Sequence, residues 1–351
     1  MRIDQPVDAE SPVLAWKPVK SDMGQSDIPQ PAEDSSRSPW HAPQAGQGGE
    51  RHPQPERSAH QPVLVNDVLE YLAPQPGAVM VDCTVGAGGH SLRLLPRLLP
   101  TGRLIAIDRD PEALALARQR LMEFHPQIEF VQGDFRHLSA ILARLGLSTV
   151  DGVVADLGMS SVQVDRPERG FSFLREGPLD MRMDSTQPTT AASLVNRLPE
   201  SELAQVIRRY GEERWASRIA KRIVTARRTQ PIQTTSQLAR IVAEAIPSGH
   251  RSYRIHPATR TFQALRIAVN DELGSLQALL EFLPEALNPG GRAAIIAFHS
   301  LEDRLVKQSF RQGAEAGIVR LLTKKPVRPP ADEQQDNPRS RSAKLRAVER
   351  C

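Results

Sequence analysis

The sequence predicts an α/β fold in which a doubly wound parallel sheet carries a helical insertion. Over residues 78–157, short apolar runs that end in turns alternate with segments of helical length. From residue 165 to about 270 the apolar runs stop and helical periodicity takes over. An apolar run at 293–298 resumes the first pattern, so the two flanking parts are expected to build one sheet.

Composition narrows the class of protein. The 351 residues are 40% hydrophobic, enough for a sizeable core, and two cysteines, Cys83 and Cys351, exclude a disulfide scaffold or a zinc site built from several cysteines. The longest apolar run is far shorter than the ~20 residues of a membrane span, and the first residues lack a signal-peptide layout. We expect a cytoplasmic protein without membrane contact. The formal net charge of +4 is compatible with nucleic acid but too small to predict it.

Four parts follow along the chain. Residues 1–59 are expected to form a disordered tail, because they carry nine of the 29 prolines and too few apolar residues to offset the loss of chain entropy. Residues 60–164 are expected to form the first part of the core and 165–270 the inserted helical domain. Residues 271–351 complete the core and end in a basic stretch.

Each core element follows from its local pattern. Buried strands are predicted at 78–82, 104–108, 128–131, 151–157 and 293–298. Helices are predicted at 91–99, after a glycine-rich turn, and from Pro111 to about residue 124. Strand–helix alternation of this kind is typical of parallel sheets.

Apolar stripes at helical spacing predict the helices of the insertion. The stripes consist of Leu203, Val206, Ile207 and Tyr210, and then of Trp215, Ile219 and Ile223. Thr235 or Ser236 is expected to cap another helix, and a long helix is expected from residue 257 or 258 to 283. A turn is predicted at 288–291, and Ser300 with Asp303 resembles a capping box.

A glycine-rich loop at 81–90 joins the first strand to its helix and predicts a nucleoside site. Glycines allow a tight turn and a close ligand, although many such loops are only turns. Asp108 ends the next strand 22 residues after Gly86, where a carboxylate can accept both ribose hydroxyls; a helix N-cap is the alternative. The Asp82 carboxylate would repel the pyrophosphate of a dinucleotide, but it suits the ammonium group of S-adenosylmethionine. The sequence therefore favours S-adenosylmethionine as the ligand. Residues 133–135 are expected to cover the adenine.

The fourth strand ends in a second polar segment, at 156–161, that predicts an acceptor site. Asp156 can accept the N–H bonds of an exocyclic amine and later its proton, with Ser160 and Ser161 as orienting hydroxyls. Asp156 could instead cap a helix or contact the cofactor. His299, after the last apolar run, is a candidate base or phosphate contact, or else a residue that starts a helix.

Eight segments of the sequence together carry a family likeness. They lie at 88–91, 106–111, 156–161, 168–173, 178–184, 210–214, 256–266 and 298–304. The most specific are Pro178-Leu179-Asp180-Met181-Arg182-Met183-Asp184 and His256-Pro257-Ala258-Thr259-Arg260-Thr261-Phe262-Gln263-Ala264-Leu265-Arg266. With these segments the sequence resembles the bacterial ribosomal RNA small-subunit methyltransferase H (MraW) family over about 60–350, which is nearly everything except the tail.

This resemblance implies a Rossmann-like S-adenosylmethionine-dependent methyltransferase core with an inserted helical domain. The implied reaction transfers a methyl group from S-adenosyl-L-methionine to the N4 amine of a cytidine in the decoding centre of 16S rRNA, within the small ribosomal subunit. The implied cofactor contacts are Gly88, Gly89, His90, Asp108, Phe135, Asp156 and Gln163. Two departures stand out: the tail has no counterpart, and the acceptor segment lacks the Asp/Asn-Pro-Pro-aromatic sequence that would supply a stacking ring.

Two basic stretches are the candidate RNA contacts. Residues 200–230 hold eight basic side chains against four acidic, and residues 320–350 hold nine against four. A solvated helix face is the alternative for the first stretch. An unstacked target base needs an aromatic neighbour, for which Phe171, Phe173 and Tyr253 are candidates alongside a role in core packing.

The rival functions are a non-catalytic RNA-binding ribosome assembly factor and an amino methyltransferase acting on DNA or a small molecule. Retention of Gly86, Gly88, Asp108 and Asp156 disfavours the first, and the long basic insertion disfavours a small substrate. Formation of a homodimer is left open.

Overall fold

The computed structural model describes residues 62–247 and 256–351, so the predicted tail at 1–59 and the candidate Tyr253 lie outside the described residues. Seven strands form one sheet: β1 (Val79–Asp82), β2 (Arg103–Asp108), β3 (Ile128–Gln132), β4 (Val150–Asp156), β5 (Leu287–Ala297), β6 (Val319–Leu321) and β7 (Lys344–Arg350). The α-helices of the described residues are α1 (Val65–Leu72), α2 (Ser91–Leu98), α3 (Pro111–Arg120), α4 (Leu138–Arg144), α5 (Ser161–Asp165), α6 (Ala191–Arg197), α7 (Glu200–Gly211), α8 (Ala216–Thr229), α9 (Thr235–Ala245), α10 (Thr259–Asn270), α11 (Glu272–Ala286), α12 (Ser300–Glu315) and α13 (Ala331–Asp336).

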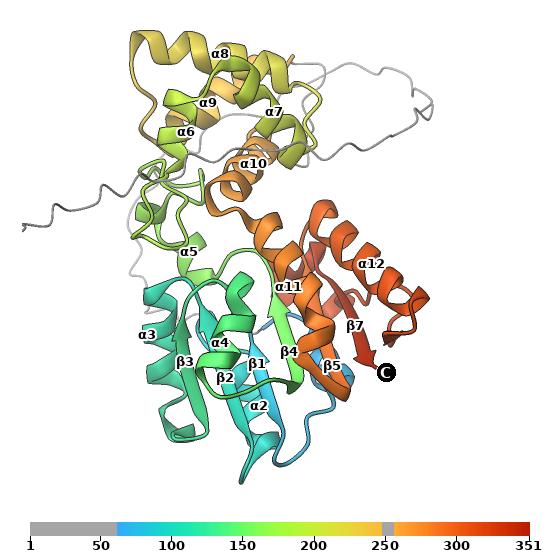
Figure 1. Ribbon diagram of the computed structural model, residues 1–351. Helices are drawn as coiled ribbons and strands as arrows, with labels where there is room; N and C mark the ends of the chain where they lie inside the picture. The colour runs from blue at the N-terminus through green and yellow to red at the C-terminus, as the bar shows by residue number, and fades with distance from the viewer. Residues whose placement is uncertain (1–61, 248–255) are drawn as a thin grey trace, which may run out of the picture. The chain divides into compact units, whose positions relative to one another are not determined.

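The sheet has the strand order β3-β2-β1-β4-β5-β7-β6 (Figure 1). Strands β1 to β5 run parallel, whereas β7 pairs antiparallel with both β5 and β6. The chain moves outward from β1 to β3 and then returns to the other side of β1 with β4. This topology confirms the expected Rossmann-like α/β fold, and the reversal between β1 and β4 is where such sheets bind ligands.

Helices cover both faces of the sheet. Alternate residues of each strand point to opposite faces, so each strand contributes side chains to both layers. Val81 of β1 faces a core formed with α4, α11 and α12, and its neighbour Met80 faces a core formed with α1, α2 and α3. Both faces are therefore apolar, as the continuous apolar runs predict. Among the described residues, none of the helices combines the length and apolar character needed to span a bilayer.

Helices α6 to α10 surround a third apolar core of their own. Leu203 and Ile207 of α7 are buried in it, as are Ile219 and Ile223 of α8, so the predicted stripes do form the packed faces of helices. This segment enters after β4 and ends where α11 leads into β5. The division of the chain into four parts stays a prediction.

The long helix predicted from residue 257 or 258 to 283 is in fact two helices, α10 and α11. Asp271 separates them with a left-handed backbone (φ 45°). Aspartate adopts this conformation more readily than most residues, and its carboxylate lies 3.0 Å from Arg136 Nη1. The interruption comes from one backbone conformation, which apolar periodicity does not reveal.

Two predicted caps and one predicted turn are displaced. Thr234 rather than Thr235 or Ser236 caps α9, and His299 with Glu302 forms the capping box of α12 in place of Ser300 with Asp303. The predicted turn at 288–291 lies inside β5, where it forms an irregularity in the pairing with β4. Gly290, at φ 79°, supplies the backbone conformation of this irregularity.

Strands β6 and β7 lie in a stretch that sequence analysis treats as a basic segment. Arg346 in β7 is only 8% exposed. Its Nε lies 2.8 Å from Asp303 Oδ1, and Lys344 Nζ lies 2.9 Å from the other oxygen. Asp303 of α12 thus pairs with both basic residues, which allows them to lie in a strand. The basic composition of this stretch alone would not predict a strand.

Candidate functional site

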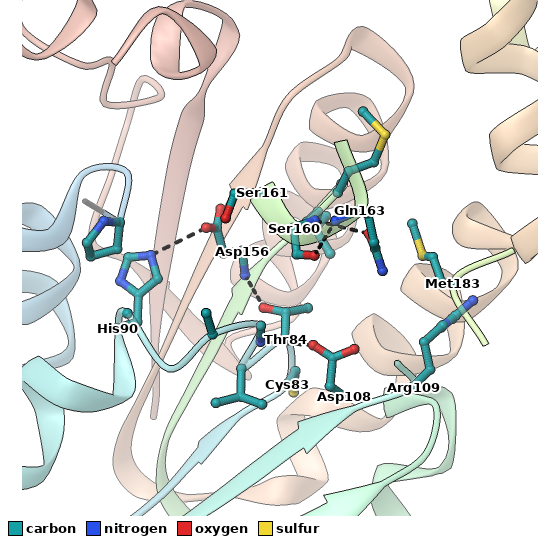
Figure 2. A pocket seen from close by; sticks show the side chains of 18 of the residues that line it. Cys83, Thr84, His90, Asp108, Arg109, Asp156, Ser160, Ser161, Gln163 and Met183 are labelled. Atoms are coloured by element: carbon teal, nitrogen blue, oxygen red, sulfur yellow. Dashed lines mark hydrogen bonds and ion pairs between the residues drawn. The ribbon is translucent and has the colours of Figure 1, made fainter. Parts of the chain in front are cut away.

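A pocket runs along the carboxyl ends of five parallel strands, and the strand order fixes the sequence of residues along it. Phe135 follows β3, Asp108 ends β2, residues 83–90 follow β1, Asp156 ends β4 and Phe298 follows β5. Figure 2 shows Asp108 and Asp156 in this pocket, on either side of the loop after β1. The two acidic side chains predicted from sequence therefore share one pocket.

The glycine loop shapes the floor of the pocket. Gly86 has a left-handed backbone (φ 52°), and its N–H donates to Asp108 Oδ2 at 2.9 Å. Gly89 lines the pocket, whereas Gly88 is not part of the lining: a Cβ there would lie 3.0 Å from Leu121 Cδ1. Gly88 therefore acts on the site through close packing of the loop.

Asp108 is prepared to accept hydrogen bonds from a diol. Its two oxygens accept from the N–H groups of Gly86 and Asp110, each at 2.9 Å. A carboxylate offers about four lone-pair positions, so about two remain for a ligand. Burial raises the pKa of Asp108 to about 6, although the two backbone N–H groups oppose the shift.

This pKa predicts a pH dependence of cofactor binding. Ribose hydroxyls donate to the ionised carboxylate, so affinity is expected to fall as the pH drops through the pKa, by roughly tenfold between pH 6.5 and pH 5. The pKa of His90 is raised above its ordinary value, because the pull of nearby carboxylates outweighs burial. Calorimetric titration at several pH values measures the effect. An Asp108→Asn variant should show a flat profile, and the same slope in that variant would contradict the assignment.

Asp156, which is half-buried, and the buried His90 form a pair at the other side of the loop. His90 Nε2 lies 3.5 Å from Asp156 Oδ2, and the side chain of His90 is 6% exposed. Asp156 Oδ1 is buried and has no hydrogen-bond partner. Thr84 Oγ1 accepts from the Asp156 N–H at 2.7 Å, which ties the end of β4 to the loop (Figure 2). A buried acceptor without a partner is costly unless a ligand donates to it.

Ser160 and Gln163 form a capping box that begins α5. The Gln163 N–H donates to Ser160 Oγ at 3.3 Å, and the Ser160 N–H donates to Gln163 Oε1 at 3.1 Å. Gln163 Nε2 also donates to Asp110 Oδ2 at 2.9 Å. Both residues line the pocket, as does Ser161. The Ser160 hydroxyl accepts in the cap and keeps its own O–H for another partner.

Asp110 links this wall of the pocket to the loop that follows α5. It is 1% exposed, caps α3, and lies 2.9 Å from Arg169 Nη1. Arg169 also donates to the carbonyl oxygens of Arg182 and Met183, each at 3.0 Å. Because Met183 lines the pocket, this buried ion pair holds part of the inserted segment against the cofactor site.

His299 lies next to the pocket but not in its lining. Its Nδ1 accepts from the Glu302 N–H at 3.3 Å, so the alternative reading as a helix-start residue describes this geometry. His299 Nε2 lies 3.2 Å from Glu302 Oε1. Glu302 itself lines the pocket and is 2% exposed. The carboxylate, rather than the imidazole, borders the pocket.

Glu302, His299 and Glu272 bring metal-ligand atoms within 4.8 Å of one another. Arg266 already supplies a positive charge there, because its Nε and Nη2 donate to both oxygens of Glu272 at 2.8 Å. Glu302 Oε2 accepts from the Phe298 N–H at 2.8 Å. These acceptor positions are committed to protein donors, and we assign no metal to the cluster.

Three residues considered for the site, Asp82, Phe171 and Phe173, lie outside the lining of the pocket. Asp82 is buried beneath the loop, where it accepts from Ser91 Oγ at 2.7 Å and from the Thr84 N–H at 3.1 Å, so it does not face the pocket. Phe171 is buried in the core of the helical segment and Phe173 packs against that core, and neither residue lines the pocket. The local sequence shows whether such a residue is polar or aromatic, but it does not show in which direction its side chain points.

A family model described as the MraW methylase family matches residues 57–351. The chain belongs to this family. S-adenosylmethionine is accordingly its cofactor. The residues present fit that molecule: Asp108, at the end of β2, has acceptor positions for the ribose hydroxyls, and Phe135, after the neighbouring strand β3, lines the same pocket.

Two relatives are similar to this chain over nearly their whole length. The ribosomal RNA small subunit methyltransferase H of Symbiobacterium thermophilum is 52% identical over 304 residues, covering 82% of this chain and 96% of that protein. The protein of the same name from Geobacter sulfurreducens is 52% identical over 307 residues, covering 83% and 99%. Among solved structures, TrmN from Thermus thermophilus is similar at 15% identity and a TM-score of 0.39, over 82% of this chain and 48% of that chain.

Two residues that help to build the site, Thr84 and Arg169, were not predicted from the sequence. Thr84 holds the end of β4, and Arg169 holds Asp110, yet neither has a motif that announces such a role. The polar segment 298–303 follows a predicted buried strand, so it was expected to open onto the same crevice. The structure shows that Phe298 and Glu302 are the residues of this segment that line the pocket, whereas His299 does not.

Proposed function

We propose that this chain transfers a methyl group from S-adenosylmethionine to the N4 amine of a cytidine in the decoding centre of 16S rRNA. Membership of the MraW methylase family supports methyl transfer, and the names of the relatives support ribosomal RNA of the small subunit as substrate. One observation carries the choice of an amine acceptor: Asp156 Oδ1 is buried, without a partner, in the same pocket as Asp108. An exocyclic amine is a donor that this oxygen can accept.

The cofactor end of the pocket is assigned from β3 to β1. S-adenosylmethionine, when bound, supplies the electrophilic methyl group. Asp108 accepts the ribose hydroxyls, and Phe135, after β3, borders the adenine. Gly89, His90 and Gln163 complete the cofactor contacts, and Gly88 supports them through loop packing. These side chains orient the ligand for in-line transfer, which depends mainly on positioning.

The acceptor end is assigned to Asp156 and Ser160. Asp156 accepts an N–H of the cytosine amine, which keeps the nitrogen lone pair directed at the methyl group, and then receives the proton that the amine loses. The Ser160 O–H, which its cap does not use, orients the base. His90 Nε2 lies 3.5 Å from Asp156 Oδ2, and the nearby carboxylates raise the pKa of His90 above its ordinary value although burial opposes this. His299 acts on this end as a positioning residue through Glu302.

Helix α8 offers a basic surface for the RNA backbone. Arg218, Lys221 and Arg228 are exposed along it. Arg214, just before the helix, is exposed and lies over the Trp215 ring at 5.4 Å. Such side chains contact phosphates without reading sequence, so binding should weaken as salt rises.

Methyl-labelled S-adenosylmethionine and small ribosomal subunits from cells that lack this enzyme test the proposal. After the reaction, nuclease digestion and mass spectrometry locate the label. We expect it on the N4 amine of one cytidine in 16S rRNA. Label on another atom or another RNA would reject the finer assignment. Cofactor binding without any transfer, on subunits and on naked RNA, would favour the rival reading as an assembly factor.

A further inference from the structure

An aromatic ring borders the acceptor end of the pocket although the acceptor segment contains none. Phe298 is half-buried, follows β5 directly and lines the pocket. The backbone of Gly158 passes beside it: a Cβ on Gly158 would lie 3.5 Å from Phe298 Cδ2. Gly158 belongs to the turn that begins at Asp156, so the ring and the carboxylate border the same turn.

The sheet register places Phe298 and Asp156 on the same side. Asp156 of β4 pairs with Ile296 of β5, and Phe298 lies two residues beyond Ile296. Side chains two apart on a strand share a face. Ile296 and Val154 both belong to the apolar core shared with α1, α2 and α3, and Phe298 packs against the same core. Asp156 and Phe298 therefore lie on this same face of the sheet, and both line the pocket.

The main chain of Phe298 is held by a buried carboxylate. Its N–H donates to Glu302 Oε2 at 2.8 Å, and Glu302 Oε1 lies 3.2 Å from His299 Nε2. The pKa of Glu302 is lowered although burial opposes this, because His299, Arg266 and backbone N–H groups favour the ionised form. A ring attached to such a fixed point is positioned before any ligand arrives.

The second phenylalanine of the lining, among the residues that the structure describes, serves the opposite end. Phe135 follows β3, and strands β2, β1 and β4 separate β3 from β5. Asp108 ends β2, the strand beside β3, whereas Asp156 ends β4, the strand beside β5. The strand order thus provides one ring for the cofactor end and another for the acceptor end.

We propose that Phe298 is the stacking surface for the target nucleobase. This inference rests on the proposed function and adds to it the residue that receives the unstacked base. One face of the cytosine lies against the Phe298 ring while its amine reaches Asp156. A base removed from its helix loses its stacking partners, and an aromatic side chain replaces them.

Two variants of Phe298 test this role. Phe298→Leu removes the ring but keeps apolar bulk, and we expect kcat/KM for small subunits to fall roughly 5- to 150-fold. Phe298→Tyr keeps the ring and should restore most of that loss. S-adenosylmethionine affinity, measured by calorimetry, should change less than about twofold in both variants. Phe135→Leu is the matched control, and it should weaken cofactor affinity instead.

Several outcomes would overturn the inference. Wild-type kcat/KM in a folded Phe298→Leu protein would remove the stacking role, as would equal losses in the leucine and tyrosine variants. A loss of cofactor affinity in both would assign Phe298 to S-adenosylmethionine. If the leucine variant fails to fold, Phe298→Met is read in the same way. Failure of the proposed function is recognised separately, because the wild-type enzyme would then place its label on a different atom.

Discussion

Replacing Asp108 with alanine is expected to weaken S-adenosylmethionine binding by roughly 10²- to 10⁴-fold. Asp108 has about two acceptor positions left after it receives the N–H groups of Gly86 and Asp110. Two charge-assisted hydrogen bonds to the ribose, at about 1.5–3 kcal/mol each, account for a loss of that size. Isothermal titration calorimetry measures the affinity, and thermal unfolding checks that the variant folds.

An exposed carboxylate on the neighbouring strand provides the control for this variant. Glu129 of β3 is solvent-exposed and does not line the pocket. Glu129→Ala removes the same charge from the protein and should leave the affinity unchanged. Unchanged affinity in a folded Asp108→Ala protein would show that Asp108 does not hold the ribose.

Asp156→Asn is expected to lower kcat at saturating S-adenosylmethionine by roughly 10²- to 10⁴-fold, the usual size of a general-base contribution. The asparagine keeps the shape of the side chain but cannot receive the proton of the amine. Single-turnover methylation of small subunits measures this step apart from product release. The cofactor affinity should change much less than kcat does.

The ratio of these two effects separates the two roles considered for Asp156. A residue that only contacts the cofactor would raise the dissociation constant and leave kcat near the wild-type value at saturation. That pattern would contradict a catalytic role. Ser160→Ala provides a comparison with Asp156→Asn. It should lower kcat less than Asp156→Asn does, because Ser160 orients the base without taking a proton.

The parallel core could be predicted from sequence because its strands are buried on both faces. Strands β1 to β4 begin and end within one residue of the predicted limits. Strand β7 could not be predicted in this way, since Arg346 and Lys344 resemble a solvated basic segment until Asp303 of α12 is placed beside them. The break at Asp271 also depends on one backbone angle, which apolar spacing does not encode.

The site was predictable where a residue ends a strand. Asp108 and Asp156 close β2 and β4, so parallel pairing brings both to one edge of the sheet. The direction of a side chain beyond a strand end was not predictable. Asp82 also ends a strand, yet its carboxylate turns beneath the loop to Ser91 and Thr84. His299 likewise turns toward its own helix, which leaves Glu302 at the pocket.

Strands β4 and β5 are neighbours in the sheet, although Val153 pairs with Ala293, 140 positions later in the chain. Joining the ends of so long a connection adds only about 2 kcal/mol of chain entropy relative to a ten-residue loop, because the cost grows with the logarithm of length. The sheet therefore accommodates a whole helical segment at little expense in stability. The larger consequence is for folding speed, because such distant pairings form late. The helices of the insertion, which bury a core of their own, shorten the span of flexible chain that must close.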